Sequence, residues 1–184
     1  MRGNNRANVY NDEQDKYHLM RCIGEAHQRF QFTMVAFCIM SNHFHLLIQS
    51  EDELSKIMAR INRRYSDYYS KRYQHVGRIY QRRYYAKAVE NPHVLLIISR
   101  YIHRNPIETV VPMVTDLIQY PHSSFPSYRQ PENAMLPYLD QIFLPQLLDM
   151  PYSKDAKGYC QYCLDSIVPD KGVVEDWVVG RELE

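Results

Sequence analysis

Two histidines separated by one residue form the sharpest chemical feature of the chain. They lie in His43-Phe44-His45, within a stretch whose residues favour a strand, and side chains on a strand alternate between its two faces. His43 and His45 therefore share one face, roughly 7 Å apart along the strand, while Phe44 points to the other face. Two imidazoles placed in this way can bind a single divalent ion. The alternative is a pair of surface histidines on an ordinary strand.

A tyrosine and an asparagine form the second candidate pair. Tyr101 and Asn105 are four residues apart in Tyr101-Ile102-His103-Arg104-Asn105-Pro106, so on a helix they share a face. A phenol there could act as a nucleophile, with the Asn105 amide as an oxygen ligand near it. The alternative is a partly buried tyrosine on an amphipathic helix.

Positive charge is concentrated in the middle of the chain. The net formal charge is only +1, but residues 56–104 hold twelve Lys and Arg against two acids, whereas residues 130–184 hold ten acids and four bases. Seven of the 16 tyrosines lie within residues 65–85 of this basic segment. Cations interleaved with aromatic rings suit a strand of nucleic acid, because phosphates pair with the cations and bases stack on the rings. The alternative is that these tyrosines are core and rim residues of an ordinary helix.

Six elements are expected to position these residues. The hydrophobic periodicity, the turn signals and the Asn91-Pro92 helix start predict a helix over 12–30, a hairpin of strands over 32–40 and 43–49, a helix over 53–73, a strand over 83–89 and a helix ending at Arg104. This order predicts an α+β, ferredoxin-like (split β-α-β) antiparallel sheet with helices on one face and its first strand missing. Residues 1–10 would have to supply that strand, and their sequence favours one poorly. After Pro106 we expect a mostly helical or irregular extension, with a short helix over 140–148.

Composition and cysteine spacing narrow the class of protein. Apolar residues make up 45% of the chain and charged residues 23%, which indicates a globular protein. The opening segment Met1–Asn11 is polar, so we expect no signal peptide, and the apolar runs are too short to span a membrane. Cys22 and Cys38 lie in apolar surroundings and are predicted to be buried thiols, so we expect a reduced, cytoplasmic protein. Cys160 and Cys163 have the spacing of a metal or redox pair, and a zinc-stabilised interaction protein is one alternative.

The combination of motifs resembles a known family. The stretch Met40-Ser41-Asn42-His43-Phe44-His45-Leu46-Leu47-Ile48 looks like the HUH motif of the IS200/IS605-type single-tyrosine transposases, and it is most similar to the REP-associated tyrosine transposases. Four further stretches fit the same pattern in order: Arg2-Gly3-Asn4-Asn5-Arg6, Gly77-Arg78-Ile79-Tyr80-Gln81-Arg82-Arg83-Tyr84, Tyr101-Ile102-His103-Arg104-Asn105-Pro106 and Tyr120-Pro121-His122-Ser123-Ser124-Phe125. The family usually has a strand before the first of these stretches. The resemblance assigns a single-tyrosine transposase-like domain to residues 1–128 and leaves an acidic, Pro-rich extension over residues 129–184.

The resemblance implies a metal-dependent enzyme that nicks single-stranded DNA and transfers the strand. Tyr101 would form a 5′-phosphotyrosine with hairpin-containing DNA, and His43, His45 and Asn105 would hold Mg²⁺ or Mn²⁺. Asn105 stands where insertion-sequence members tend to have Gln, and Asn is what the REP-associated branch has. The expected partner is single-stranded or hairpin DNA, with no membrane, and the protein would be a monomer or a homodimer.

The cations of the basic segment are the residues expected to contact DNA. They are Arg60, Arg63, Arg64, Lys71, Arg78, Arg82, Arg83, Lys87, Arg100 and Arg104. Such contacts to phosphate position the DNA without reading its bases. The alternative function is a catalytically silent or decayed module that binds single-stranded nucleic acid.

Overall fold

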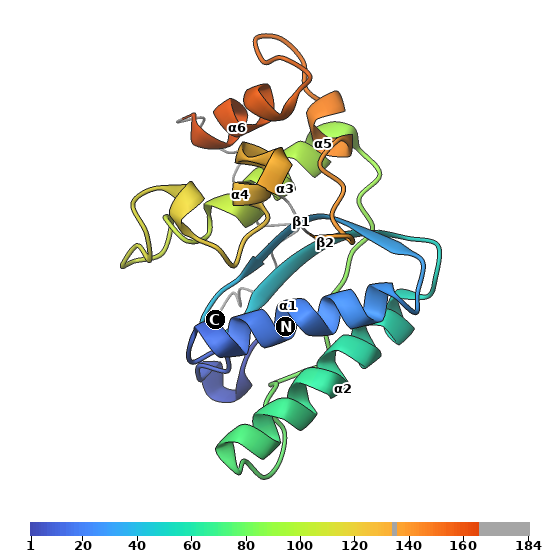
Figure 1. The fold of residues 1–184 in the computed structure, drawn as a ribbon, viewed down its shortest axis with the longest axis vertical. Helices are drawn as coiled ribbons and strands as arrows, with labels where there is room; N and C mark the ends of the chain where they lie inside the picture. The colour runs from blue at the N-terminus through green and yellow to red at the C-terminus, as the bar shows by residue number, and fades with distance from the viewer. Residues whose placement is uncertain (134–135, 166–184) are drawn as a thin grey trace.

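A two-stranded antiparallel sheet surrounded by helices forms the centre of the protein (Figure 1). The computed structural model describes residues 1–133 and 136–165. Strand β1 (Phe32–Ile39) pairs with β2 (Phe44–Ser50) in a register that runs from Phe32 opposite Ser50 to Ile39 opposite Phe44. The helices are α1 (Glu13–His27), α2 (Leu54–Tyr73), α3 (Pro92–Arg104), α4 (Phe125–Arg129), α5 (Phe143–Gln146) and α6 (Ala156–Leu164), with short 3-10 turns η1 (Asn4–Arg6), η2 (Leu117–Gln119) and η3 (Pro131–Asn133). The α+β class and the antiparallel hairpin are confirmed.

Helices cover both faces of the sheet rather than one. Met34, Phe37 and Ile39 of β1 enter a core shared with α1 and α2, whereas Ala36 and Cys38 enter a second core shared with α3, α4 and α6. In Figure 1 the sheet accordingly lies between α1 and α2 below and α3, α4 and α6 above. The reason is that both sets of alternating side chains on β1 are apolar, so each face needs a cover.

Both long edges of the hairpin are met by other segments through isolated bridges. Directly before β2, Arg2 pairs with His43, and the neighbouring Gly3 pairs with Tyr80. At the β1 edge, Leu139 pairs with Met34, and Ser123 pairs with Cys38. Residues 1–10 would have had to supply the missing first strand, and residues 2 and 3 contribute single bridges and no strand. These bridges satisfy backbone groups that an uncovered edge would leave without partners.

The strand expected over residues 83–89 does not form. This segment has no regular structure, and most of its side chains are exposed, among them Arg83, Tyr85 and Lys87. It offers no apolar face that could be buried against a sheet, so the β-favouring residues in it do not decide its structure. The helix that follows begins as predicted, because the Asn91 side chain accepts hydrogen bonds from the backbone N–H groups of His93 (2.9 Å) and Val94 (3.3 Å).

The described part of the extension packs into the cores of the hairpin rather than forming a core of its own. Tyr138 belongs to the core beneath β1, while Leu144 and Tyr159 belong to the core above it. The short helix expected over 140–148 is present as α5. Within the two described ranges, no helix is long and apolar enough to cross a membrane.

Candidate active site between strand β2 and helix α3

The structure brings together three of the predicted site residues, which come from distant parts of the chain. His45 lies in β2 and His43 lies directly before it, and their imidazole centroids are 4.9 Å apart with nearly perpendicular rings. The ring of Tyr101 on α3 lies 5.6 Å from that of His45, again edge to face. All three side chains are half-buried. Because Phe44 between the histidines enters the opposite core, the strand directs both imidazoles toward α3, as the alternation predicts.

Asn105 lies one helical turn after Tyr101 on the same side of α3. It is the C-cap of the helix, and its side-chain Nδ2 donates a hydrogen bond to the Tyr101 carbonyl oxygen over 2.8 Å. Asn105 is only 6% exposed. This bond uses the nitrogen of the amide and turns the other amide atom, Oδ1, away from the helix carbonyl. Its described contact is with the backbone of α3 rather than with an imidazole.

The donor types of this site fit a small divalent ion. Imidazole nitrogens and an amide oxygen are ligands found for such ions in proteins. The imidazole rings of His43 and His45 are already close together, with 4.9 Å between their centroids. Among residues 1–133 and 136–165, no group of three or more His, Cys, Asp and Glu side chains could hold a metal ion. The predicted ligand set is not such a group, because it contains only two histidines and its third member, Asn105, is an asparagine. The metal-ligand role of these three residues stays a prediction.

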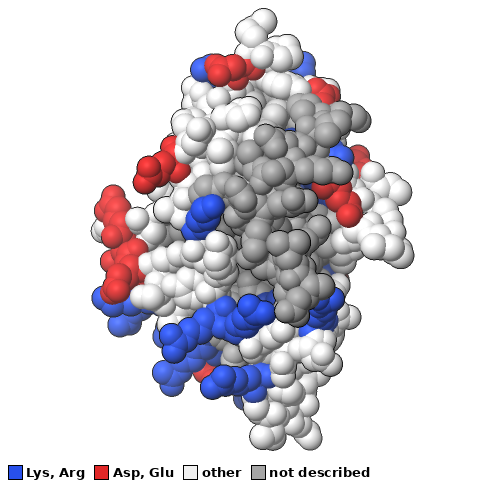
Figure 2. Space-filling view, turned by 180° about the vertical axis from the view of Figure 1, so that it is seen from behind, with Lys and Arg blue, Asp and Glu red and all other residues white. Residues whose placement is uncertain are grey.

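Most of the predicted DNA-contacting cations are exposed, and they gather at one end of the molecule. Figure 2 shows Lys and Arg side chains concentrated at the lower end, where α2 lies, with Asp and Glu side chains spread over the sides and the upper end. Arg60 is half-buried on α2, and Arg64 is paired with Glu25 of α1 over 3.1 Å. The exposed members are Arg63, Arg64, Lys71, Arg78, Arg82, Arg83 and Lys87.

Arg100 and Arg104 lie elsewhere and have a structural role in this conformation. Arg100 is 4% exposed, and its guanidinium donates to the carbonyl oxygens of Tyr162 (3.0 Å) and Asp165. Arg104 donates to the Cys163 carbonyl oxygen over 3.0 Å. Cations are favoured at this end of a helix, because the last carbonyls lack partners within it. The two arginines therefore tie α3 to the C-terminal end of α6, away from the exposed cations of α2, and a count of charges along the sequence cannot distinguish these two roles.

The tyrosines of the basic segment divide into structural and exposed residues. Tyr65 is fully buried and donates to the Val9 carbonyl oxygen. Tyr68 and Tyr73 donate to the buried carboxylate of Asp15 over 3.0 and 2.7 Å, and so join α2 to α1. Tyr85, by contrast, is 62% exposed among the cations of residues 82–87. The core interpretation therefore holds for most of the α2 tyrosines, whereas the ring of Tyr85 is open to solvent.

The cysteine pair of α6 belongs to the upper core. Cys160 and Cys163 are 3% and 0% exposed, and the Cys163 sulfur lies 3.8 Å from Nδ1 of His103. Burial raises the pKa of Cys160 to about 11 and that of Cys163 well above its usual range. Thiols that stay protonated pack as small apolar groups, so this pair acts as core residues in the structure.

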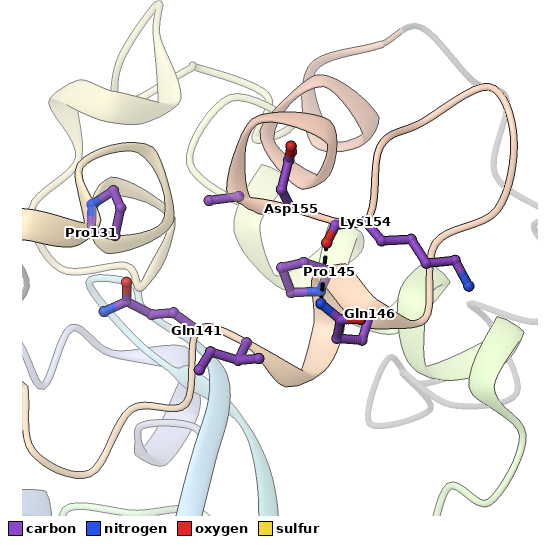
Figure 3. A pocket seen from close by; sticks show the side chains of 8 residues that line it. Pro131, Gln141, Pro145, Gln146, Lys154 and Asp155 are labelled. Carbon is purple, nitrogen blue, oxygen red and sulfur yellow. Dashed lines mark hydrogen bonds between the residues drawn. The ribbon is translucent and has the colours of Figure 1, made fainter.

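A surface pocket lies apart from the candidate site (Figure 3). It has a volume of about 280 Å³ and is lined by residues between Pro131 and Ala156, including Ile142 of the turn before α5 and Gln146 of α5. Gln146 donates to the Lys154 carbonyl oxygen over 3.2 Å at its rim. None of the predicted site residues lines it.

Sequence reasoning missed one residue at this site. The sequence analysis gives Asn42 no role of its own in the stretch that contains the two histidines, yet its side-chain oxygen lies 2.6 Å from Nδ1 of His43. An asparagine directly before a candidate ligand histidine is a weak signal, because the same residue also favours turns.

Comparison with known proteins gave one match. Residues 1–105, which include both histidines, Tyr101 and Asn105, match the family model described as "Transposase IS200 like". No curated protein and no solved structure matched the chain.

Proposed function

The chain belongs to the IS200-like transposase family, and we propose that it cuts and rejoins single-stranded, hairpin-containing DNA with Tyr101 as the nucleophile. The observation that supports this most directly is the meeting of Tyr101 with His45 and His43, since residues 56 positions apart in the chain form one cluster. A tyrosine on an ordinary amphipathic helix has no reason to face two histidines on one face of a strand. Transposition of DNA requires that strands be cut and joined, which is chemistry that a phenol can perform.

In the proposed step, Oη of Tyr101 attacks the phosphorus of a phosphodiester. A bond forms between Oη and phosphorus, the bond between phosphorus and the 3′ oxygen breaks, and the phenol proton ends on that oxygen as a 3′-hydroxyl. The product is a 5′-phosphotyrosine. Because one phosphate ester replaces another, attack by a second 3′-hydroxyl reverses the step, restores Tyr101 and joins the strands without a nucleotide cofactor.

His43, His45 and Asn105 would hold the Mg²⁺ or Mn²⁺ ion that the family implies. When bound, such an ion polarises the scissile phosphate and offsets the negative charge that develops on it. A phenol is mostly protonated at neutral pH, so Tyr101 also depends on being held against its target. Helix α3 provides this support, because hydrogen bonds from Arg100 and Arg104 anchor it to α6.

The exposed cations of α2 and of residues 78–87 would hold the DNA. Their contacts to phosphate are independent of sequence, and Tyr85 would add stacking on an unpaired base. Single strands and hairpin loops satisfy both contacts, whereas the bases of a plain duplex are already stacked on one another.

Covalent capture tests the proposal. A pool of oligonucleotides with one constant hairpin and randomised single-stranded flanks is incubated with the protein and Mn²⁺, then resolved under denaturing conditions. A label at the 3′ end should remain on the protein, and a label at the 5′ end should be released on a shorter strand. We expect Tyr101→Phe to abolish the adduct while binding stays within a few-fold, because the ring is kept and only the attacking oxygen is lost.

Tyr17→Phe is the matched control, since it removes a phenol oxygen from a tyrosine of α1 that is 51% exposed and lies outside the cluster, and it should still form the adduct. An adduct that persists in Tyr101→Phe would overturn the nucleophile. Tight binding of the pool by the wild-type protein, with no adduct in Mn²⁺ or Mg²⁺, would instead favour the catalytically silent binding module.

A further inference from the structure

The side chain of Asn42 links the N-terminal segment to His43. Its Nδ2 donates a hydrogen bond to the backbone carbonyl oxygen of Arg6 over 3.3 Å, and its Oδ1 lies 2.6 Å from Nδ1 of His43. Asn42 therefore stands between the first turn of the chain and one of the two candidate ligand histidines. The question is which of the two ring nitrogens of His43 carries the proton.

The contact between Asn42 and the Arg6 carbonyl shows which nitrogen of His43 carries the proton. A carbonyl oxygen can only accept a hydrogen bond, so the amide atom that faces it must be the NH₂ group of Asn42. The atom that faces His43 is then the amide oxygen, which also can only accept. The proton between Asn42 and His43 must therefore be on Nδ1, and in the neutral ring the lone pair is on Nε2.

We propose that Asn42 is a positioning residue that holds His43 in the tautomer protonated on Nδ1, so that Nε2 is the atom presented to a divalent ion. The inference rests on the proposed function in one respect only, which is that His43 binds the ion. Partners that fix the tautomer and the ring orientation of a ligand histidine are a general requirement of metal sites.

Backbone hydrogen bonds from the N-terminal segment hold the turn formed by Ser41 and Asn42. The Gly3 N–H donates to the backbone oxygen of Asn42 over 2.8 Å. The N–H groups of Val9 and Tyr10 donate to the Ser41 oxygen over 3.0 and 2.9 Å. The turn before His43 is thus hydrogen-bonded to residues 3–10, and the Asn42 side chain has a defined direction.

The backbone of this segment is bent in the way that presents the Arg6 carbonyl. Asn5 and Arg6 both have positive φ, at 50° and 56°, which is uncommon for residues other than glycine. At Gly3 a Cβ atom would lie 2.1 Å from the Ala7 oxygen, so only glycine fits. The glycine at position 3 therefore allows the loop to close tightly, and the loop presents the Arg6 carbonyl to the Asn42 amide.

Nitrogen-15 NMR of the metal-free full-length protein tests the tautomer directly. The chain has eight histidines, and His43→Gln identifies the His43 signals by their loss. At a pH where the ring is neutral, wild-type His43 should show a protonated Nδ1 and an unprotonated Nε2. Asn42→Ala should move the ring toward the form protonated on Nε2 and should weaken the binding of Mn²⁺ alone, measured by titration calorimetry, by roughly 10- to 100-fold.

Asn42→Asp is the conservative variant, and it should keep the wild-type tautomer because it retains an acceptor oxygen beside Nδ1. Asn4→Ala, at an exposed asparagine of the same segment, should change neither the tautomer nor the Mn²⁺ affinity. A wild-type His43 protonated on Nε2 would overturn the inference, as would an Asn42→Ala variant with unchanged tautomer and Mn²⁺ affinity. Neither readout involves DNA, so a failure to form the Tyr101 adduct would count against the proposed function and leave the role of Asn42 standing.

Discussion

His103 should make the protein lose stability on mild acidification, because it is buried where it cannot take up a proton. It lies on α3 two residues after Tyr101, hence on the opposite side of the helix, and it is 0% exposed. Its Nε2 is 2.7 Å from the Ser124 hydroxyl and its Nδ1 is 3.1 Å from the Tyr159 hydroxyl. Burial lowers the pKa of His103 to about 3. This residue therefore connects the packing of α3, α4 and α6 to pH.

The size of the effect follows from the difference in pKa between the two states. Above pH 6.5 the ring is neutral in both the folded and the unfolded chain, and the full stability is present. Between pH 6.5 and about 3 the unfolded chain binds a proton that the folded protein does not, so the free energy of unfolding falls by about 1.4 kcal/mol for each pH unit. From pH 7.5 to pH 5.0, His103 alone should lower it by about 2 kcal/mol.

Urea unfolding at pH 7.5 and pH 5.0 measures this loss. The variant His103→Gln cannot titrate, so its stability should fall by about 2 kcal/mol less than that of the wild type over the same interval, whatever its stability at pH 7.5. The burial that lowers the pKa of His122 acts in both proteins and cancels in the comparison. His75→Gln, at an exposed histidine after α2, is the control and should follow the wild type.

Parallel losses of stability in wild type and His103→Gln would refute the reasoning. If His103→Gln does not fold, the NMR titration of the wild-type His103 ring decides the matter, because a midpoint near 6.5 would show that the ring is accessible to protons.

Two further predictions concern the metal and the DNA. His43→Ala and His45→Ala should each remove Mn²⁺-dependent cleavage of the hairpin pool, because the one imidazole and one amide that remain hold a divalent ion weakly. Cleavage by the wild-type protein that persists in EDTA would contradict the metal assignment. Binding to single strands should weaken steeply with salt, with a log–log slope near −4 if about six cations engage phosphates. Arg63→Ala should make that slope shallower by about 0.7, while Arg64→Ala should change it less because Glu25 already pairs with Arg64 over 3.1 Å. If neither Arg63→Ala nor Arg64→Ala changes the salt slope, the charged face of α2 is only solvated and does not contact DNA.

The local elements near the site could be predicted because short-range chemistry determines them. The apolar residues of β1, the turn at Ser41-Asn42 and the cap at Asn91 each specify their element without reference to the rest of the chain. The shared face of His43 and His45 follows from strand geometry alone. The meeting of these histidines with Tyr101 does not follow from any local pattern, and only the family resemblance placed them together.

The parts that could not be predicted depend on contacts between distant residues. A charge count assigned Arg100 the same role as Arg63, yet Arg100 is buried against the end of α6 whereas Arg63 is exposed. Residues 1–3 are a poor strand sequence, and they pair with His43 and Tyr80 because the β2 edge needs partners. The exposed segment 83–89 shows the reverse case, in which residues suited to a strand find no sheet to join.

The most direct test of the account is to identify the residue that becomes attached to DNA. Trypsin cleaves after Arg100 and Arg104, so Tyr101 lies in the peptide Tyr101-Ile102-His103-Arg104, which contains a single tyrosine. After the adduct is trimmed with nuclease, mass spectrometry should find this peptide carrying a nucleotide attached through its 5′-phosphate. A nucleotide on another tyrosine peptide, such as Tyr84-Tyr85-Ala86-Lys87, or one attached through a 3′-phosphate, would contradict the assignment of Tyr101 as the nucleophile.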